Sequence, residues 1–220
     1  MEIFTFEGVS VLLRWFHVLA GVTWIGILYY FNFIQTPFFG TELGGQAKGA
    51  MITWITGVLI ILTKLGHDKV PLDSAYMTLI LTGGLMGTFM WANVWFVIWP
   101  AQQVVIASAE KVAAGGEADP AAASRGARAG LASRTNTLFS VPMLFFMVAA
   151  ANLQRLATPE AGGGVGLYWI CALVVIFAVE ANALIRPGLA TQKPLASVRG
   201  TLHAGVVLAI VLYALMAIAI

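Results

Sequence analysis

Charged residues and cysteines are scarce in this sequence. Charged residues make up only 10% of its 220 positions, whereas a soluble globular domain carries roughly 25%, so there are too few to cover a water-exposed surface. The single cysteine, Cys171, excludes an internal disulfide, and the lack of a CxxCH motif excludes covalently attached c-type haem. The formal net charge is +2 without a basic cluster, which excludes a nucleic-acid partner.

Motifs of the common soluble enzymes are also missing. The chain contains no P-loop, no HExxH, no GxSxG and no glycine-rich dinucleotide fingerprint. Three histidines and one cysteine cannot form a metal site with several nitrogen and sulfur ligands. No catalytic residue is assigned from the sequence, and redox chemistry would require a bound organic cofactor or a partner protein.

Long apolar runs dominate the chain. It is 60% hydrophobic, with a mean hydropathy of +0.87, and its uncharged runs approach the ~20 residues that a helix needs to cross a bilayer. They predict an all-α fold, an integral membrane helical bundle of about six transmembrane helices that forms one domain and contacts lipid. Within this domain of residues 1–220, the predicted spans are 9–34, 49–65, 74–99, 137–153, 165–185 and 200–220.

The longest connection, residues 101–134, is predicted to be a cytoplasmic loop. Its first part, 101–114, can continue the third helix, and the alanine- and glycine-rich residues 115–130 are predicted to form a flexible linker. Six spans put both termini on one side, and eight basic residues on the loop side against four on the other predict that both termini lie outside the cytoplasm. The eight are Lys48, Lys111, Arg125, Arg128, Arg134, Arg186, Lys193 and Arg199.

An ionisable side chain within a span is a functional hypothesis by default, and His17 is the first candidate. Gly21 and Trp24 follow four and seven residues later, so the three share one helix face. The glycine leaves room for a flat macrocycle, and neutral imidazole is the usual axial ligand of haem iron. The alternative is a histidine that is hydrogen-bonded within the bundle. His203 lies near the opposite face, too far in depth to share an iron with His17.

A second ionisable candidate is Glu180, about a turn and a half before Arg186. A carboxylate that is neutralised by Arg186, or by another basic residue, is the favoured interpretation. A proton-relay group is the alternative.

Small and polar residues within the spans predict contacts between helices. Gly83 and Gly87 form a GxxxG face for close helix approach. Asn93 and Asn136 should find hydrogen bonds between helices, including one with each other. Pro142 lies inside the fourth span, where neighbouring helices must satisfy the backbone groups that it frees.

Four stretches form a pattern that is more specific than membrane composition. They are LLRWFHVLAGVTWIG at 12–26, MGTFMWANVWFVIWPAQQ at 86–103, NTLFSVPMLFFM at 136–147 and, more weakly, ALIRPG at 183–188. In this order they resemble the membrane domain of the bacterial membrane-bound urate oxidase (urate hydroxylase) family, and they cover most of the chain. That family has a C-terminal cytochrome c domain after the membrane domain, and the sequence up to Ile220 lacks it.

The resemblance implies a candidate cofactor site. His17 matches the family's first-helix histidine, whereas histidines of the family pattern are replaced by Gly83 and Thr135. Joined with the helix face above, the site would hold a b-type haem, with His17 as the metal ligand. Its expected cofactor-binding residues are His17, Gly21, Trp24, Trp91, Asn93 and Asn136.

Two functions from different classes follow. In the first, the protein is a redox module of the bacterial inner membrane, with both termini periplasmic, that passes electrons to a separate periplasmic cytochrome c. In the second, it is a non-catalytic structural or assembly subunit of a larger inner-membrane complex. A transporter ranks third, because no pair of broken helices occurs at matching positions in two halves.

Overall fold

The structure is a computed structural model, and it describes residues 6–30, 44–152 and 164–219. Those ranges contain helices and no strand, which confirms the predicted all-α class. The helices are α1 (Phe6–Tyr30), α2 (Gly44–Gly66), α3 (Ala75–Ala92), the π-helix η3 (Asn93–Ile98), α4 (Trp99–Ala113), α5 (Ala122–Asn152), α6 (Val165–Leu184), the 3₁₀-helix η5 (Ala190–Ala196) and α7 (Val198–Ala219). A bilayer offers no partners for free backbone groups, so an apolar chain of this kind satisfies them within helices.

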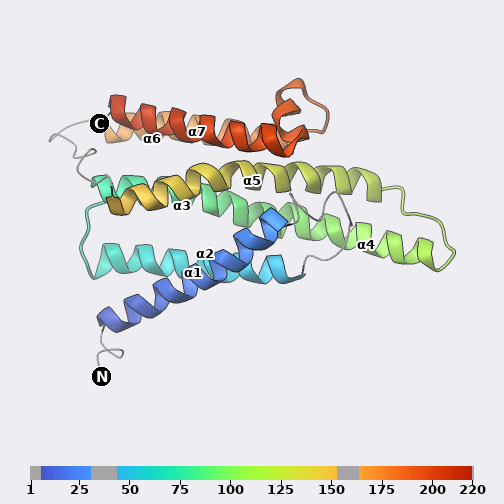
Figure 1. The fold of residues 1–220 in the computed structure, drawn as a ribbon, viewed down its shortest axis with the longest axis horizontal. Helices are drawn as coiled ribbons and strands as arrows, with labels where there is room; N and C mark the ends of the chain where they lie inside the picture. The colour runs from blue at the N-terminus through green and yellow to red at the C-terminus, as the bar shows by residue number, and fades with distance from the viewer. Residues whose placement is uncertain (1–5, 31–43, 153–163, 220) are drawn as a thin grey trace.

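The helices form a bundle with α3 and α5 at its centre. The pair α1 and α2 flanks them on one side, and the pair α6 and α7 on the other (Figure 1). The start of α1 and the end of α7 lie at the same end of the bundle, as an even number of crossings requires (Figure 1). By length and composition, five helices of the described chain can cross a membrane, and α1 contributes a shorter apolar stretch, Ala20–Tyr30. The last four residues of the first predicted span, 31–34, lie outside the described residues.

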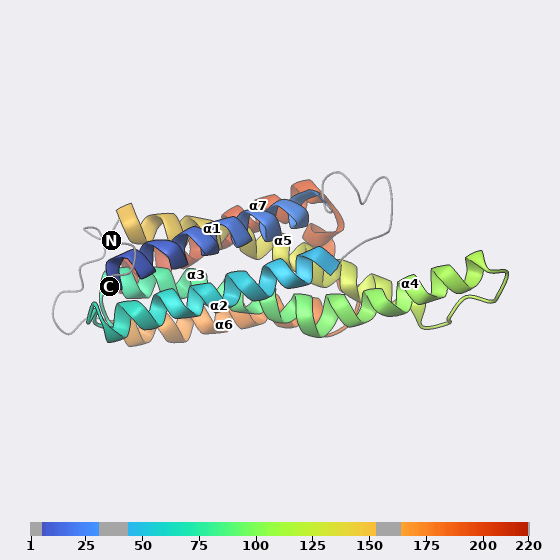
Figure 2. The same ribbon diagram turned by 90° about the horizontal axis from the view of Figure 1, so that it is seen from below.

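One helical rod is far longer than a membrane is thick. Helices α3, η3 and α4 run without a break over the 39 residues Ala75–Ala113, about 58 Å at 1.5 Å per residue, against ~30 Å for the hydrocarbon core. The end of α4 and the start of α5 therefore project together beyond the bundle (Figures 1 and 2).

This projecting hairpin corrects the predicted linker. Residues 101–113 continue the helix, as expected, but α5 already begins at Ala122, so only residues 114–121 lie outside helices. The linker prediction failed because alanine is the strongest helix former and the first turns of α5 pack against α4. A Cβ atom at Gly126 would lie 3.5 Å from Cγ2 of Val105. The side of the membrane on which the hairpin lies stays a prediction.

Glycines bring the central helices together. A Cβ atom at Gly83 of α3 would lie 3.1 Å from the carbonyl oxygen of Met143 in α5, and one at Gly87 would lie 3.5 Å from the Met143 sulfur. The prediction that Gly83 and Gly87 face another helix is confirmed.

Pro142 within α5 is accommodated by a glycine of α7. Proline has no N–H, so the carbonyl of Leu138, four residues earlier, loses its usual helical donor. Gly205 approaches that carbonyl so closely that a Cβ atom would lie 2.8 Å from it. Such an approach permits Cα–H···O contacts to the freed carbonyl.

The outward faces of the bundle are apolar. Large hydrophobic side chains are exposed on α1, α2, η3, α5, α6 and α7, and exposed apolar surface of this extent marks contact with a partner or a membrane. They include Val22, Leu62, Phe96, Val148, Ile170, Val174 and Ile210. The protein is thus a multi-pass membrane protein whose outer surface contacts lipid.

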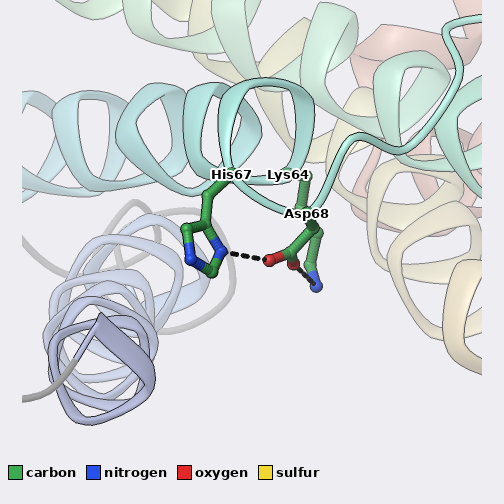
Figure 3. Close-up of polar contacts among 3 residues, drawn as sticks. All are labelled: Lys64, His67 and Asp68. Atoms are coloured by element: carbon green, nitrogen blue, oxygen red, sulfur yellow. Dashed lines mark hydrogen bonds and ion pairs between the residues drawn. The ribbon is translucent and has the colours of Figure 1, made fainter.

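A polar turn ends the bundle between α2 and α3. Asp68 accepts hydrogen bonds from Nδ1 of His67, at 3.0 Å, and from Nζ of Lys64 (Figure 3). The bond from His67, followed by that from Lys64, lowers the pKa of Asp68 below its ordinary value. Ser74 caps α3 through its hydroxyl, which accepts from the backbone N–H of Met77. These contacts fix the turn at the end of the bundle where the termini lie.

Candidate functional site

Three polar side chains from three helices meet in the core of the bundle. Asn93 at the start of η3 donates from Nδ2 to Oδ1 of Asn136 in α5, at 3.0 Å, and to Oε2 of Glu180 in α6, at 3.1 Å. Exposure is 2% for Asn93, 0% for Asn136 and 5% for Glu180. The predicted hydrogen bond between Asn93 and Asn136 is confirmed, and we call Asn93, Asn136 and Glu180 the amide–carboxyl cluster.

The favoured interpretation of Glu180 is wrong. Within the described chain Glu180 forms no ion pair, and Arg186 is exposed. Arg186 lies two residues beyond the last residue of α6, outside the helix that carries Glu180. The carboxyl group faces the core, where its partner is an amide on another helix.

The cluster lies where α3 passes into the π-helix η3, of which Asn93 is the first residue. The wider turn of η3 carries the N–H of Trp99 to the carbonyl of Val94, five residues back. The side chain of Asn136 donates from Nδ2 to the carbonyl of Met90 at 3.0 Å, just before η3. Single turns of π-helix occur frequently at functional sites. The π-helix η3 was not predicted from the sequence.

His17 lies between α1 and α2 and contacts the Thr56 hydroxyl. The distance from Nδ1 of His17 to Oγ1 of Thr56 is 3.0 Å. That hydroxyl donates its one hydrogen to the carbonyls of Ile52, at 2.7 Å, and Thr53, at 3.1 Å. Therefore Nδ1 of His17 is the donor, and Nε2 is the ring nitrogen that keeps its lone pair. Sequence reasoning missed Thr56, whose only signal is a polar residue within a neighbouring span.

The other residues of the His17 face pack directly on α2. A Cβ atom at Gly21 would lie 3.9 Å from Cγ2 of Thr53, and one at Gly49 would lie 3.6 Å from Cβ of Trp24. A Cβ atom at Gly57 would lie 3.1 Å from Cε1 of His17. Small residues of both helices thus bring α1 and α2 into contact along the face on which His17 lies.

Tryptophans gather beside this helix pair. Trp91 stacks on Trp54 of α2, with ring centroids 4.5 Å apart and planes tilted by 14°. Trp54 donates from its indole to the hydroxyl of Thr88 at 3.2 Å. The buried indole nitrogens of Trp24, Trp91 and Trp95 have no hydrogen-bond partner in the described part of the chain.

The six predicted cofactor residues therefore fall into two groups. His17, Gly21 and Trp24 line the contact between α1 and α2, whereas Asn93 and Asn136 lie in the amide–carboxyl cluster between α3, α5 and α6. Trp91 lies two residues before η3 and stacks on Trp54 of α2. The described residues contain no group of three or more His, Cys, Asp or Glu side chains that could hold a metal ion.

Two positions where the family pattern has histidine lie in the core. Gly83 is packed on the Met143 carbonyl, and Thr135 is fully buried, with its hydroxyl bonded to the Leu131 carbonyl of its own helix. At Gly83 a larger side chain would meet the backbone of α5.

Comparison with known proteins identifies the family. Residues 38–218 match the profile of the family described as urate oxidase N-terminal. The matched residues include the stretches at 86–103, 136–147 and 183–188, whereas the stretch at 12–26, with His17, precedes them. No curated protein and no solved structure matches the chain. With most of its length matched, the chain belongs to the urate oxidase N-terminal family and forms a urate-oxidase-like membrane module.

Proposed function

We propose that this protein is a membrane redox module, in which His17 ligates the iron of a b-type haem and electrons leave to a separate cytochrome c. The observation that carries the proposal is the hydrogen bond between Nδ1 of His17 and Thr56. A ligating imidazole is typically held in this way, with one nitrogen donating to a protein acceptor and the other left for the metal. Membership of the urate oxidase N-terminal family supports an oxidative role.

Of the residues expected at the haem, His17 fits the proposal, whereas Gly21 and Trp24 do not. His17 fits as a single axial ligand, because its Nε2 keeps a lone pair. Gly21 and Trp24 do not provide a space for the macrocycle, since α2 fills that face. When bound, the haem would supply one-electron transfer. Thr56 would orient the imidazole and fix its tautomer, and the apolar outer face of α1, with Val18 and Val22 exposed, would keep water away.

The proposed location is the bacterial inner membrane with both termini in the periplasm. The eight-to-four distribution of basic residues supports it. The start of α1 and the end of α7 lie at one end of the bundle, so both would face the compartment of the proposed cytochrome c (Figure 1).

A second candidate is a non-catalytic structural or assembly subunit of a larger inner-membrane complex. The close packing of Gly21, Gly49 and Gly57 favours it, because the same face that could hold a cofactor already joins α1 to α2. On this alternative, the hydrogen bond of His17 stabilises the helix pair.

The absorption spectrum of the purified protein separates the two candidates. A redox module should show a b-type haem in the reduced-minus-oxidised spectrum, and His17→Ala should abolish it while the protein stays inserted in the membrane. Thr56→Val keeps the ligand but removes its acceptor, so it should weaken haem binding about 10–100-fold. The matched control is His203→Ala, on the exposed His203 of α7, which should leave the spectrum unchanged. A wild-type protein without haem after expression with ample haem would refute the redox module and favour the assembly subunit.

A further inference from the structure

The carboxyl group of Glu180 lies in the bundle core without a counter-ion. It accepts one hydrogen bond, from Asn93, and within the described ranges it has no other hydrogen bond or ion pair. Its exposure is 5%. Ionisable groups within a membrane are costly and, where they occur, commonly mark ion or proton pathways. The proposed haem site at His17 does not include this group.

The hydrogen bonds of the cluster determine which atoms face the carboxyl group. The carbonyl of Met90 can only accept, so the atom of Asn136 that contacts it must be the amide nitrogen. Oδ1 of Asn136 is then an acceptor, and it fixes the amide of Asn93 with its nitrogen toward both Asn136 and Glu180. Asn93 thus presents an N–H to Oε2 of Glu180, and Oε1 is the oxygen that is free to carry a proton.

No cation of the neighbouring helices compensates the carboxyl group. Helix α6 packs against α3, α5, α7 and η5, and α3 contains no Asp, Glu, Lys, Arg or His. The charged and titratable groups of α6, of these elements and of the segment between α6 and η5 are Tyr76, Arg125, Arg128, Arg134, Tyr168, Cys171, Arg186, Lys193, Arg199, His203 and Tyr213. None of them hydrogen-bonds or pairs with Glu180. A negative charge at Glu180 would therefore have no direct ion pair, which favours a bound proton.

Glu180 lies close to one end of the bundle. It is four residues, or about 6 Å along the helix axis, from the last residue of α6. Beyond that end, Gln192 of η5 donates to the carbonyls of Asn182 and Arg186, at 2.6 and 2.7 Å. The exposed basic residues Arg186, Lys193 and Arg199 surround this end. A proton has a short route to water here and a long one through the rest of the bundle.

We propose that the amide–carboxyl cluster is an intramembrane proton-binding site. Oε1 of Glu180 takes up one proton, which converts the carboxylate to a carboxylic acid, and releases it toward the η5 end of the bundle. Asn93 holds Oε2 in both states, Asn136 holds Asn93, and the Met90 carbonyl holds Asn136. The cluster is separate from His17, so this proposal stands whether or not the protein binds haem.

Labelling with dicyclohexylcarbodiimide tests the site, because this apolar reagent reacts with protonated carboxyl groups inside membrane proteins. The full protein in lipid nanodiscs is labelled between about pH 6 and about pH 10, far above the ordinary glutamate pKa of about 4.3. Mass spectrometry should find an adduct on Glu180 at the lower pH that declines as the pH rises. Glu180→Gln should lose the adduct, Glu180→Asp should retain it, and the control Glu110→Gln, at an exposed position of α4, should leave it unchanged.

Three results would overturn the proposal. No adduct at any pH would mean that Glu180 is ionised and paired. An adduct that is equally strong throughout the pH range would mean a permanently neutral, structural carboxyl group. Protection from labelling by Na⁺ but not by choline at equal ionic strength would make the cluster a sodium site instead. If Glu180→Gln fails to fold, the pH series on the wild type and on Glu180→Asp still decides between these outcomes.

Discussion

The contact between α5 and α7 allows a quantitative prediction, since Gly205 lies against backbone. In Gly205→Ala the new Cβ atom would lie 2.8 Å from the carbonyl oxygen of Leu138 and 3.0 Å from two carbons of Val141. A backbone oxygen cannot rotate away, so the overpacking cost should reach the upper part of its usual range, about 3 kcal/mol. Helix propensity returns about 1 kcal/mol when alanine replaces glycine. The net loss of unfolding free energy is then about 2 kcal/mol.

A matched substitution isolates the close approach from the change in propensity. In Gly84→Ala the new Cβ atom would lie 3.7 Å from Cδ1 of Ile61, an ordinary contact, so this variant should gain up to about 1 kcal/mol. At about 2–4 °C per kcal/mol for a chain of this size, Gly205→Ala should unfold about 4–8 °C below the wild type. The only cysteine, Cys171, is half-buried in α6, so a thiol-reactive dye in detergent can follow unfolding. Equal melting temperatures for the two variants would refute the close approach of α7 to α5.

The remaining predictions concern orientation, the polar turn and the core. A reporter that is active only in the periplasm should give a signal when fused after Ile220 and none when inserted within residues 114–121; the reverse pattern would contradict the proposed orientation. Because the pKa of Asp68 is lowered, its contacts should stabilise the turn fully above the ordinary pKa of about 4 and be lost as the pH falls through the lowered value. Hydrogen exchange in the turn should show this loss in the wild type and not in Asp68→Asn. Asn136→Leu should destabilise the protein by about 1–3 kcal/mol, because it removes an acceptor of the buried Asn93 amide and the side-chain bond to the Met90 carbonyl. Thr135→Val removes only a bond within its own helix and should cost less in the same melting assay.

Much of the fold could be predicted because the bilayer limits the choices. A chain with long apolar runs must satisfy its backbone within helices, so the length of each run predicts a span. The GxxxG motif of Gly83 and Gly87 predicted a contact between helices, and Gly83 of α3 packs against the Met143 carbonyl of α5. The hairpin of α4 and α5 was only half predicted, since the composition of residues 122–130 resembles a linker until α4 is present to pack against it.

The candidate sites were less accessible to sequence reasoning, because each depends on which helices are neighbours. The amides Asn93 and Asn136 were paired correctly, since buried amides in different spans have few other partners. The place of Glu180 beside them was not predicted, because Arg186 is nearer in sequence, yet it lies beyond the end of α6 and is exposed. The acceptor for His17 was not predicted either, as nothing in α1 indicates that Thr56 of α2 faces it.

The π-helix also has a consequence for the register of the chain. A π turn holds one residue more than an α turn. The helical pattern of residues 99–113 is therefore shifted by one sequence position from that of residues 75–92. No single 3.6-residue pattern describes the whole rod. Deleting one residue within 94–98 would leave Asn93 in the phase of α3 and turn α4 by about 100° about the rod axis, away from its contacts with α5. The extra residue of η3 therefore sets the direction from which α4 meets α5 in the projecting hairpin.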